Sequence, residues 1–119
     1  MTTGIVVFGH GSRVEAANES VRQAARELAR LGQLAYVEPA FLELGEPDLE
    51  GAVVRLMGQG VRHIRVIPYF LTLGTHLERD LPRIIHDISS KFSDLEIEAT
   101  APLEGHPGLI AALLDRANT

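Results

Sequence analysis

The sequence contains no cysteine among its 119 residues. Disulfide bonds, thiolate metal sites and cysteine nucleophiles are therefore excluded, and any bound metal must be held by histidine and carboxylate side chains. Such ligands suit iron, cobalt, nickel or zinc. Long apolar runs are also missing, so no segment is predicted to span a membrane. The N-terminus lacks the basic region and apolar stretch of a secretory signal, and we expect a cytoplasmic protein.

The chain has fewer positive than negative side chains: it contains 11 Lys and Arg and 16 Asp and Glu, and the formal net charge is -5. This balance argues against a nucleic-acid partner, which requires a basic surface. Hydrophobic residues make up 45% of the chain and charged residues 23%, as in a soluble globular protein. The length allows one domain with one core, and we assign residues 1–119 to it.

Four short β-rich segments alternate with four segments of helical spacing. Strands are predicted over residues 5–8, 35–42, 64–71 and 95–101, with helices beginning near residues 14, 48, 80 and 107. Pro39 favours an edge position for the second strand, and Pro82 fits the first turn of the third helix. This order predicts an α/β fold in three layers: a mainly parallel, four-stranded sheet flanked by helices, as in flavodoxin-like folds. The last helix carries Leu109, Ile110, Leu113 and Leu114 on one side.

In such sheets, ligands bind beyond the carboxyl ends of the strands, so the four loops that follow the strands are candidates for a site. His10, Glu43 and His76 lie in three of these loops. Two imidazoles and a carboxylate that converge there would form a three-ligand metal site with positions open for substrate. Gly11 and Gly74, near the two histidines, allow unusual backbone angles and close approach of a ligand.

Each candidate also has a simpler interpretation. His10 and His76 are consistent with loop histidines that are hydrogen-bonded to the backbone, and Glu43 lies in a cluster of glutamates typical of a solvated surface. His63 is placed at the opposite end of the sheet, and His86 is predicted to point into solvent. Neither of these two is expected to act in a site.

The segment that contains His10 also invites other functions. Gly-His-Gly-Ser is not a P-loop, which requires Gly-Lys-Ser/Thr, and it is not the Gly-x-Ser-x-Gly turn of a nucleophilic serine. A phosphate-binding turn remains an alternative, because helix N-termini attract anions. Ser12 as a nucleophile beside His10 is a further alternative, but the sequence supplies no evident acid partner.

Four blocks of sequence resemble the motifs of the sirohydrochlorin chelatases, the class II tetrapyrrole chelatases. They occur in the family's order and at its spacing, and they span almost the whole chain. The resemblance implies a chelatase-like α/β fold. The blocks are Phe8 to Arg13, Ala40 to Glu43 followed by Pro47, Ile67 to Pro82 with Gly74, His76 and Asp80 at their motif positions, and Pro102 to Pro107.

The resemblance implies an enzyme that inserts Co²⁺ or Fe²⁺, or Ni²⁺ in some members, into sirohydrochlorin without ATP, for cobalamin, sirohaem or cofactor F430. The metal is a substrate, and no permanently bound cofactor is implied. His10 and His76 would be metal ligands and proton acceptors, and Glu43 would complete the coordination or relay protons. The residues expected to bind substrate are Gly11, Ser12, Arg13, Phe70, Leu71, Gly74 and Thr75.

Sirohydrochlorin carries many carboxylates, whereas this chain is acidic, so local positive charge is expected at the site. Arg13, Arg79 and the N-termini of the first and third helices are the candidates. Two other functions stay open. One is a non-catalytic metal or tetrapyrrole carrier with the same ligands, and the other is a flavodoxin-like phosphate-binding module that would need neither Glu43 nor His76.

We also expect a homodimer, because one small domain covers only one face of a macrocycle and two-fold dimers are common. The alternative is that the chain is one half of a longer protein, or that the apolar residues near the rim are simply core. The expected contact surface comprises Tyr69, Phe70, Leu71 and Leu73.

Overall fold

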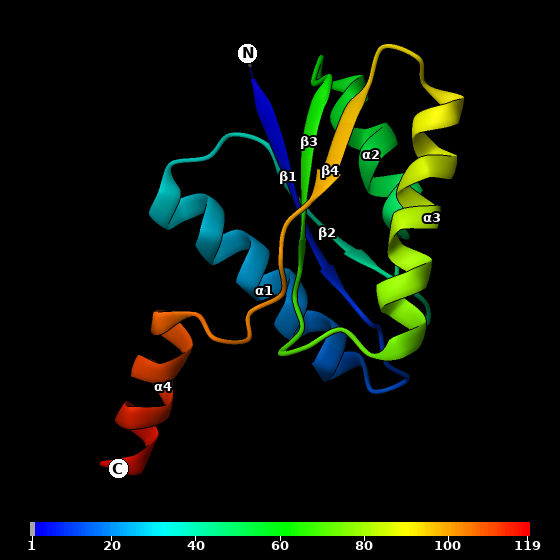
Figure 1. Cartoon of the computed structure of the whole chain (residues 1–119). Helices are drawn as coiled ribbons and strands as arrows, with labels where there is room; N and C mark the ends of the chain where they lie inside the picture. The colour runs from blue at the N-terminus through cyan, green and yellow to red at the C-terminus, as the bar shows by residue number, and fades with distance from the viewer. Residues whose placement is uncertain (1) are drawn as a thin grey trace.

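The computed structural model describes residues 2–119, and its elements follow the predicted βαβαβαβα order (Figure 1). All four strands are parallel, in the spatial order β2-β1-β3-β4, so the predicted α/β fold is confirmed. The strands are β1 (Thr3–Gly9), β2 (Val37–Phe41), β3 (His63–Pro68) and β4 (Glu96–Ala99), and the helices are α1 (Glu15–Gly32), α2 (Leu49–Gly58), α3 (Thr75–Lys91) and α4 (Pro107–Ala117).

Helix α1 covers one face of the sheet, and α2 and α3 cover the other (Figure 1). Alternate residues of β1 supply both cores: Val6 and Phe8 pack with α2 and α3, while Val7 packs with Val21 and Ala25 of α1. Each of these five side chains is at most 9% exposed. A strand that is covered on both faces needs apolar residues on both, and the sequence therefore shows a continuous apolar run there.

Several features of the first two βα units agree with the predictions made from local sequence signals. β2 lies at an edge of the sheet, as Pro39 predicts, because a proline cannot donate to a neighbouring strand. Asp48 is the N-cap of α2, as predicted, and its Oδ1 accepts the N–H of Gly51 at 2.8 Å. α1 ends at Gly32, the predicted stop.

The third βα unit differs from its predicted limits. β3 ends at Pro68 rather than at residue 71, and α3 begins at Thr75 rather than near Asp80. The reason is an apolar stripe that extends further towards the N-terminus than expected, because Leu77 and Leu81 are both buried.

Pro82 consequently lies inside α3 and not in its first turn. A proline inside a helix removes one backbone hydrogen bond, at a cost of about 3 kcal/mol in an isolated helix. The burial of Leu77 and Leu81 on the neighbouring positions offsets this cost, since each apolar side chain that is fully buried contributes about 1.5–3 kcal/mol.

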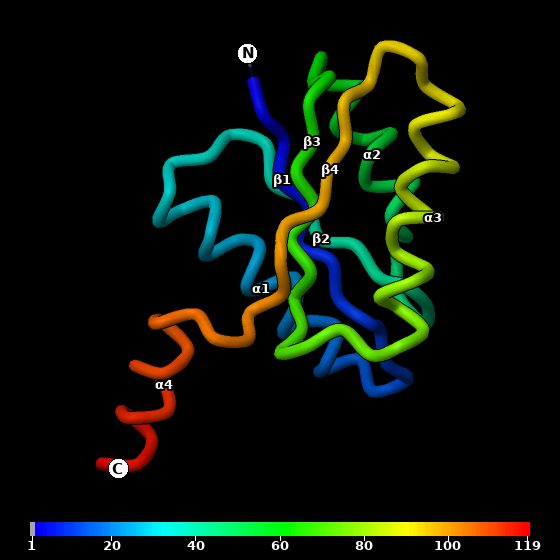
Figure 2. Tube along the Cα trace, in the orientation of Figure 1, coloured from blue at the N-terminus to red at the C-terminus, as the bar shows by residue number. Residues whose placement is uncertain are grey.

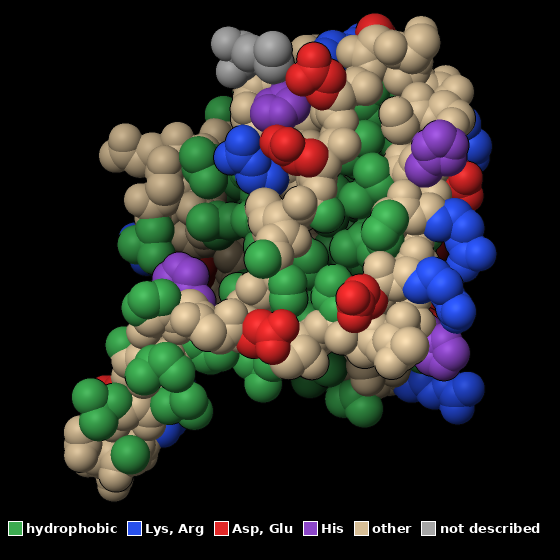
Figure 3. All heavy atoms as spheres, in the orientation of Figure 1, with side chains coloured by type: hydrophobic (Ala, Val, Ile, Leu, Met, Phe, Trp, Pro, Cys, Tyr) green, Lys and Arg blue, Asp and Glu red, His purple; other side chains and the backbone are tan. Residues whose placement is uncertain are grey.

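Helix α4 forms where predicted but does not cover the sheet. It leads away from the rest of the chain in both the ribbon and the tube views, and its surface is rich in hydrophobic side chains (Figures 1, 2 and 3). None of its residues is buried, and Ile110, Leu113 and Leu114 are 56%, 60% and 62% exposed. We call residues 107–117 the α4 arm. Neither this arm nor another helix of residues 2–119 is long and apolar enough to cross a membrane.

Candidate functional site

The loops after β1 and β2 are joined by backbone hydrogen bonds at the carboxyl edge of the sheet. The N–H of Leu42 donates to the carbonyl of Gly9 at 2.9 Å, and the N–H of Glu43 donates to the carbonyl of His10 at 3.1 Å. The parallel pairing of the two strands thus continues past their ends. The structure therefore brings His10 and Glu43, two of the predicted site residues, side by side.

The side chains of these two residues also meet. Nε2 of His10 lies 3.5 Å from Oε1 of Glu43, and the two side chains are 60% and 58% exposed. The His10 ring packs edge-on against Phe70, with 6.4 Å between the ring centroids, and Phe70 packs against the buried ring of Phe8 at 6.3 Å. Aromatic contacts thus hold the imidazole against the core while its nitrogen faces Glu43 and solvent.

His76 lies in the first turn of α3 and not in a loop, because that helix begins at Thr75. It lines a hollow of about 290 Å³ together with His10, Leu42 and Phe70. Its Nδ1 accepts a hydrogen bond from Arg79 at 3.3 Å. The predicted pair of histidines therefore borders one cavity, although the two side chains come from different kinds of element.

Within residues 2–119, no three His, Asp or Glu side chains are grouped closely enough to hold a metal ion. His10 and Glu43 form a pair, and His76 lies elsewhere on the wall of the same hollow. His10, Glu43 and His76 therefore do not form the expected three-ligand arrangement in this structure. The roles of these residues as metal ligands stay predictions.

A second hollow, of about 330 Å³, lies beside the N-terminal part of α1 and shares His10 and Phe70 with the first. Most of the residues predicted to bind substrate border one hollow or the other. They are Gly11 and Ser12 in the second hollow, Gly74 and Thr75 in the first, and Phe70 in both.

Arg13 and Leu71 are exposed, and the lining of neither hollow includes them. Their role in substrate binding stays a prediction. Ser12 has a structural role, since its Oγ accepts the N–H of Val14 at 3.0 Å just before α1. This bond gives the hydroxyl a local partner but does not test the alternative of a nucleophilic serine.

The two glycines near the histidines behave differently. Gly11 has a φ of +93°, and a Cβ atom there would lie 1.6 Å from the carbonyl oxygen of Glu43. The β1 loop therefore passes directly against the β2 loop, and glycine is required at this position. Gly74 has a φ of -69°, and a Cβ atom there would meet nothing within 4 Å. The predicted unusual backbone angle is confirmed at Gly11 and wrong at Gly74, which is the ordinary N-cap of α3.

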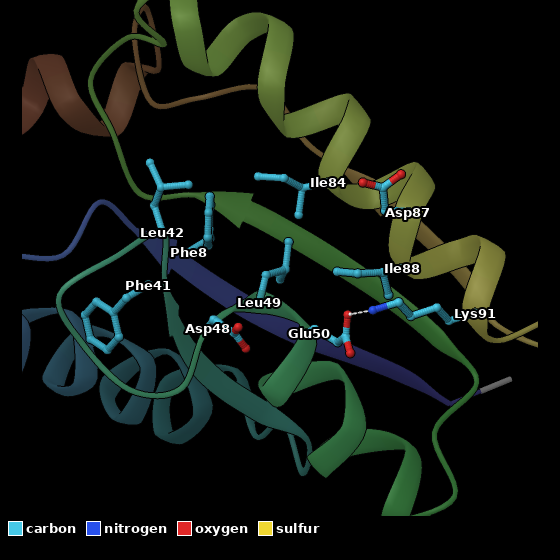
Figure 4. Close-up of a pocket in the computed structure, with 10 residues that line it drawn as sticks. All are labelled: Phe8, Phe41, Leu42, Asp48, Leu49, Glu50, Ile84, Asp87, Ile88 and Lys91. Atoms are coloured by element: carbon cyan, nitrogen blue, oxygen red, sulfur yellow. Dashed lines mark hydrogen bonds and ion pairs between the residues drawn. The ribbon is translucent and has the colours of Figure 1, made fainter.

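A third hollow, of about 300 Å³, opens between α2 and α3 (Figure 4). Its floor includes Phe8 and Leu42, and Leu42 also lines the hollow that contains both histidines. Lys91 of α3 donates to Glu50 of α2 at 2.7 Å, and this hydrogen bond raises the pKa of Lys91 above its usual value. The ion pair ties the C-terminal end of α3 to the N-terminal end of α2.

The other histidines have structural partners or face solvent. His63 lies at the opposite end of the sheet, as predicted, where it bonds Thr3 at 2.9 Å and Glu98 at 3.1 Å. His86 is exposed, which was also predicted. His106 is the N-cap of α4, and its Nδ1 accepts the N–H of Gly108 at 2.8 Å.

The sequence analysis missed Asn18, which is 2% exposed and contacts the loops of His10 and Glu43. The signal was present in the helical spacing. Asn18 precedes Val21 and Ala25 on the same buried face of α1, so a polar residue interrupts an otherwise apolar stripe.

Comparison with known proteins identifies relatives over nearly the full sequence. A family model described as CbiX matches residues 4–119. The sirohydrochlorin cobaltochelatase of Methanosarcina barkeri is 38% identical over 101 residues, which are 84% of this chain and 78% of the relative. The chloroplastic sirohydrochlorin ferrochelatase of Arabidopsis thaliana is 33% identical over 113 residues, which are 95% of this chain and 50% of the relative.

A solved structure agrees with these relatives. The sirohydrochlorin chelatase SirB from Bacillus subtilis subspecies spizizenii, in complex with cobalt, matches with a TM-score of 0.90 and 28% identity, over 99% of this chain and 50% of SirB. The chain thus spans about half the length of SirB and of the Arabidopsis relative. Because the family model matches residues 4–119, which include the four loops at the carboxyl ends of the strands, we conclude that the chain belongs to the CbiX family.

Proposed function

We propose that this chain is a cytoplasmic sirohydrochlorin chelatase that inserts Co²⁺ or Fe²⁺ without ATP, with Ni²⁺ as a third candidate metal. The relatives support the first two metals, since one is named a cobaltochelatase and another a ferrochelatase. The observation that carries the proposal is the hollow lined by both His10 and His76, with the Glu43 carboxylate 3.5 Å from the His10 imidazole.

Metal insertion exchanges two pyrrole N–H protons of the macrocycle for one divalent ion, so two protons must leave as the metal enters. His10 takes one of them on Nε2, and the adjacent Glu43 carboxylate stabilises the imidazolium. His76 accepts the second. The Nδ1 of His76 receives a bond from Arg79, and a substrate carboxylate that binds Arg79 frees this lone pair for a proton or a metal.

The shape of the site suits a broad, flat ligand. Both hollows share His10 and Phe70, so a macrocycle that spans them lies with His10 beneath its central part. The N-terminal ends of α1 and α3 flank the two hollows and supply partial positive charge. Together with Arg79 they offset the acidity of the chain where the carboxylates of the substrate would bind.

We expect the purified protein to accelerate the formation of cobalt- and iron-sirohydrochlorin over the reaction without protein, because the site holds proton acceptors near the metal. The measurement is an anaerobic absorbance assay with sirohydrochlorin and each metal in turn. Product in excess of one equivalent per chain identifies an enzyme. Formation of one equivalent and no more would instead identify a carrier, and rates equal to the protein-free control with every metal would refute the proposal.

We further propose that the working unit is a homodimer, in which the α4 arm packs against the second copy. An isolated helix of fewer than about 12 residues is marginal in water, so its stability must come from packing of its apolar face. The arm spans residues 107–117 and buries none of them within its own chain. Its apolar surface is therefore unpartnered in the single chain (Figure 3).

A second copy is the partner that we propose, because two copies together would match the length of SirB and of the Arabidopsis protein, of each of which this chain covers 50%. A second α/β unit would also supply a wall for the uncovered face of the macrocycle. Of the contact residues predicted near the rim, Tyr69 and Leu71 are 40% and 62% exposed. Phe70 and Leu73 are half-buried, and Phe70 is already engaged by His10. The α4 arm therefore adds the larger apolar surface.

Leu113→Glu is expected to convert the dimer to a monomer and to lower insertion activity, because the charge would lie in the buried contact. Sedimentation velocity at micromolar concentration measures the change. Leu31→Glu is the matched control, since Leu31 is 74% exposed on α1 and outside the proposed contact, so this variant should remain a dimer. A wild-type protein that sediments as a monomer with full activity would contradict the proposal.

A further inference from the structure

We infer that Asn18 is a positioning residue that holds the His10 loop and the Glu43 loop in one fixed arrangement; the inference rests on the proposed function. The side chain comes from α1 and is 2% exposed. Among residues 2–119 it is the one polar side chain that is buried, and it lies on a helix face that is otherwise apolar. A polar group in such a place is retained only when its hydrogen bonds are satisfied.

Every polar atom of the Asn18 side chain has a partner in the two loops. Its Oδ1 accepts the N–H of Ser12 at 2.8 Å, and its Nδ2 donates to the carbonyl of Ser12 at 2.9 Å and to the carbonyl of Leu44 at 2.9 Å. A longer contact of 3.4 Å joins Nδ2 to the Glu15 carboxylate. Ser12 lies two residues after His10, and Leu44 directly follows Glu43. One amide thus connects the backbones that carry both side chains.

The backbone of the joined loops has little freedom to adapt. Leu44 has a φ of +56°, a left-handed conformation that is strained for a residue with a side chain, and its carbonyl is one of the Asn18 acceptors. Gly45, the next residue, would place a Cβ atom 3.3 Å from Nδ2 of Asn18. The amide therefore fills the space between the loops and fixes the turn that follows Glu43.

The arrangement matters because the two reactive side chains are not enclosed by the core. His10 and Glu43 are 60% and 58% exposed and lie 3.5 Å apart, so their separation depends on where their backbones stand. Catalytic groups lose efficiency when their supporting residues no longer hold them within a fraction of an ångström. An apolar residue at position 18 would fill the core but leave two carbonyls and one N–H without partners.

Two variants separate the contributions of the amide. Asn18→Ala removes all of its bonds, while Asn18→Asp keeps the acceptor for the Ser12 N–H but places a carboxylate against the carbonyl of Leu44. Val53→Ala is the matched control, since Val53 belongs to α2 and is fully buried against the other face of the sheet. We expect both Asn18 variants to lower kcat for cobalt insertion by about tenfold with a smaller change in KM, and Val53→Ala to lower stability alone.

A double-mutant cycle with Glu43→Gln tests whether Asn18 acts through the Glu43 loop. In that background Asn18→Ala should reduce kcat by clearly less than tenfold, because one of the two groups that it positions has already lost its charge. Two outcomes would overturn the inference. One is an equal tenfold loss of kcat from Asn18→Ala in both backgrounds. The other is a loss of kcat in Val53→Ala in proportion to its loss of stability, because kcat would then follow stability alone.

Hydrogen exchange of the backbone amides tests the positioning role independently of activity. If the wild type shows no metal insertion, the proposed function is refuted, but the exchange measurement still tests whether Asn18 holds the loops. The Ser12 N–H should exchange at least about tenfold faster in Asn18→Ala and stay protected in Asn18→Asp, because only the first variant removes its acceptor. Exchange of the Glu43 amide, which donates to the carbonyl of His10, should rise in both variants. Unchanged exchange in Asn18→Ala would show that the amide does not hold the loops.

Discussion

Replacing His10 with alanine is expected to lower the rate of cobalt insertion by about 10²–10⁴-fold, the range that one positioned proton-transfer group contributes. His10 is shared by the two hollows and lies beside Glu43, so the proposed macrocycle cannot bind without meeting it. The side chain is 60% exposed, and its removal leaves no buried cavity. The free energy of unfolding should therefore change by no more than about 0.5 kcal/mol.

His76→Ala should cause a similar loss, because the proposed reaction has two protons to remove and a second histidine in the same hollow to accept one. Glu43→Gln should be milder, since the amide keeps the shape of the carboxylate and loses only its charge. Initial rates in the anaerobic absorbance assay measure all three variants.

His63→Ala is the control for these variants. His63 is bonded to Thr3 and Glu98 at the opposite end of the sheet, so its loss should affect stability and leave turnover intact. If His63→Ala were as inactive as His76→Ala, the reaction could not be assigned to the carboxyl edge of the sheet.

Gly11→Ala is also expected to be strongly damaging, although it adds only one methyl group. The new Cβ would lie 1.6 Å from the carbonyl oxygen of Glu43, so the two loops must separate. The φ of +93° adds backbone strain of about 1–3 kcal/mol for any residue with a side chain. Separation of the loops removes the His10–Glu43 pair, and insertion should fall by at least about a hundredfold.

Gly58→Ala is the matched control, because Gly58 lies at the end of α2, lines neither hollow, and has no positive φ and open space at its Cβ position. This variant should fold and turn over like the wild type. Urea unfolding gives the stability of both variants, and the absorbance assay gives their rates. Comparable behaviour of the two alanine variants would mean that the contact between the β1 and β2 loops is not needed.

The parts of the fold that depend on local signals could be predicted from the sequence. The β-branched run of β1, the edge position of β2 with Pro39 and the Asp48 cap of α2 all follow from short-range geometry. The start of α3 could not be placed in this way, because Pro82 favours a first turn while Leu77 and Leu81 favour an earlier one. Burial of the leucines decided the outcome, and burial depends on the sheet and not on the neighbouring residues.

The sequence was sufficient to predict at which edge of the sheet the site lies. Parallel strands bring their carboxyl ends together, which was enough to place His10 beside Glu43. The contact of Arg79 with His76 could not be foreseen, because it depends on the true start of α3. Asn18 was missed for another reason. Its partners are backbone groups of two distant loops, and backbone groups do not depend on residue type, so the sequence does not reveal which of them Asn18 binds.

The position of the α4 arm is also beyond local prediction. The spacing of Leu109, Ile110, Leu113 and Leu114 indicates a helix with an apolar side, and the helix is present. Which residues cover that side depends on tertiary or quaternary contacts, and in the single chain Ile110, Leu113 and Leu114 are exposed to solvent.

The uncovered α4 arm has a consequence for the fate of the protein inside a cell. A single chain displays the kind of apolar surface that chaperones bind and proteases attack. The proposed pairing would hide that surface, and the fraction of paired chains would rise with concentration by mass action. Newly made chains at low abundance would therefore be degraded faster than chains at high abundance, so the steady-state level of the protein should rise more steeply than its rate of synthesis.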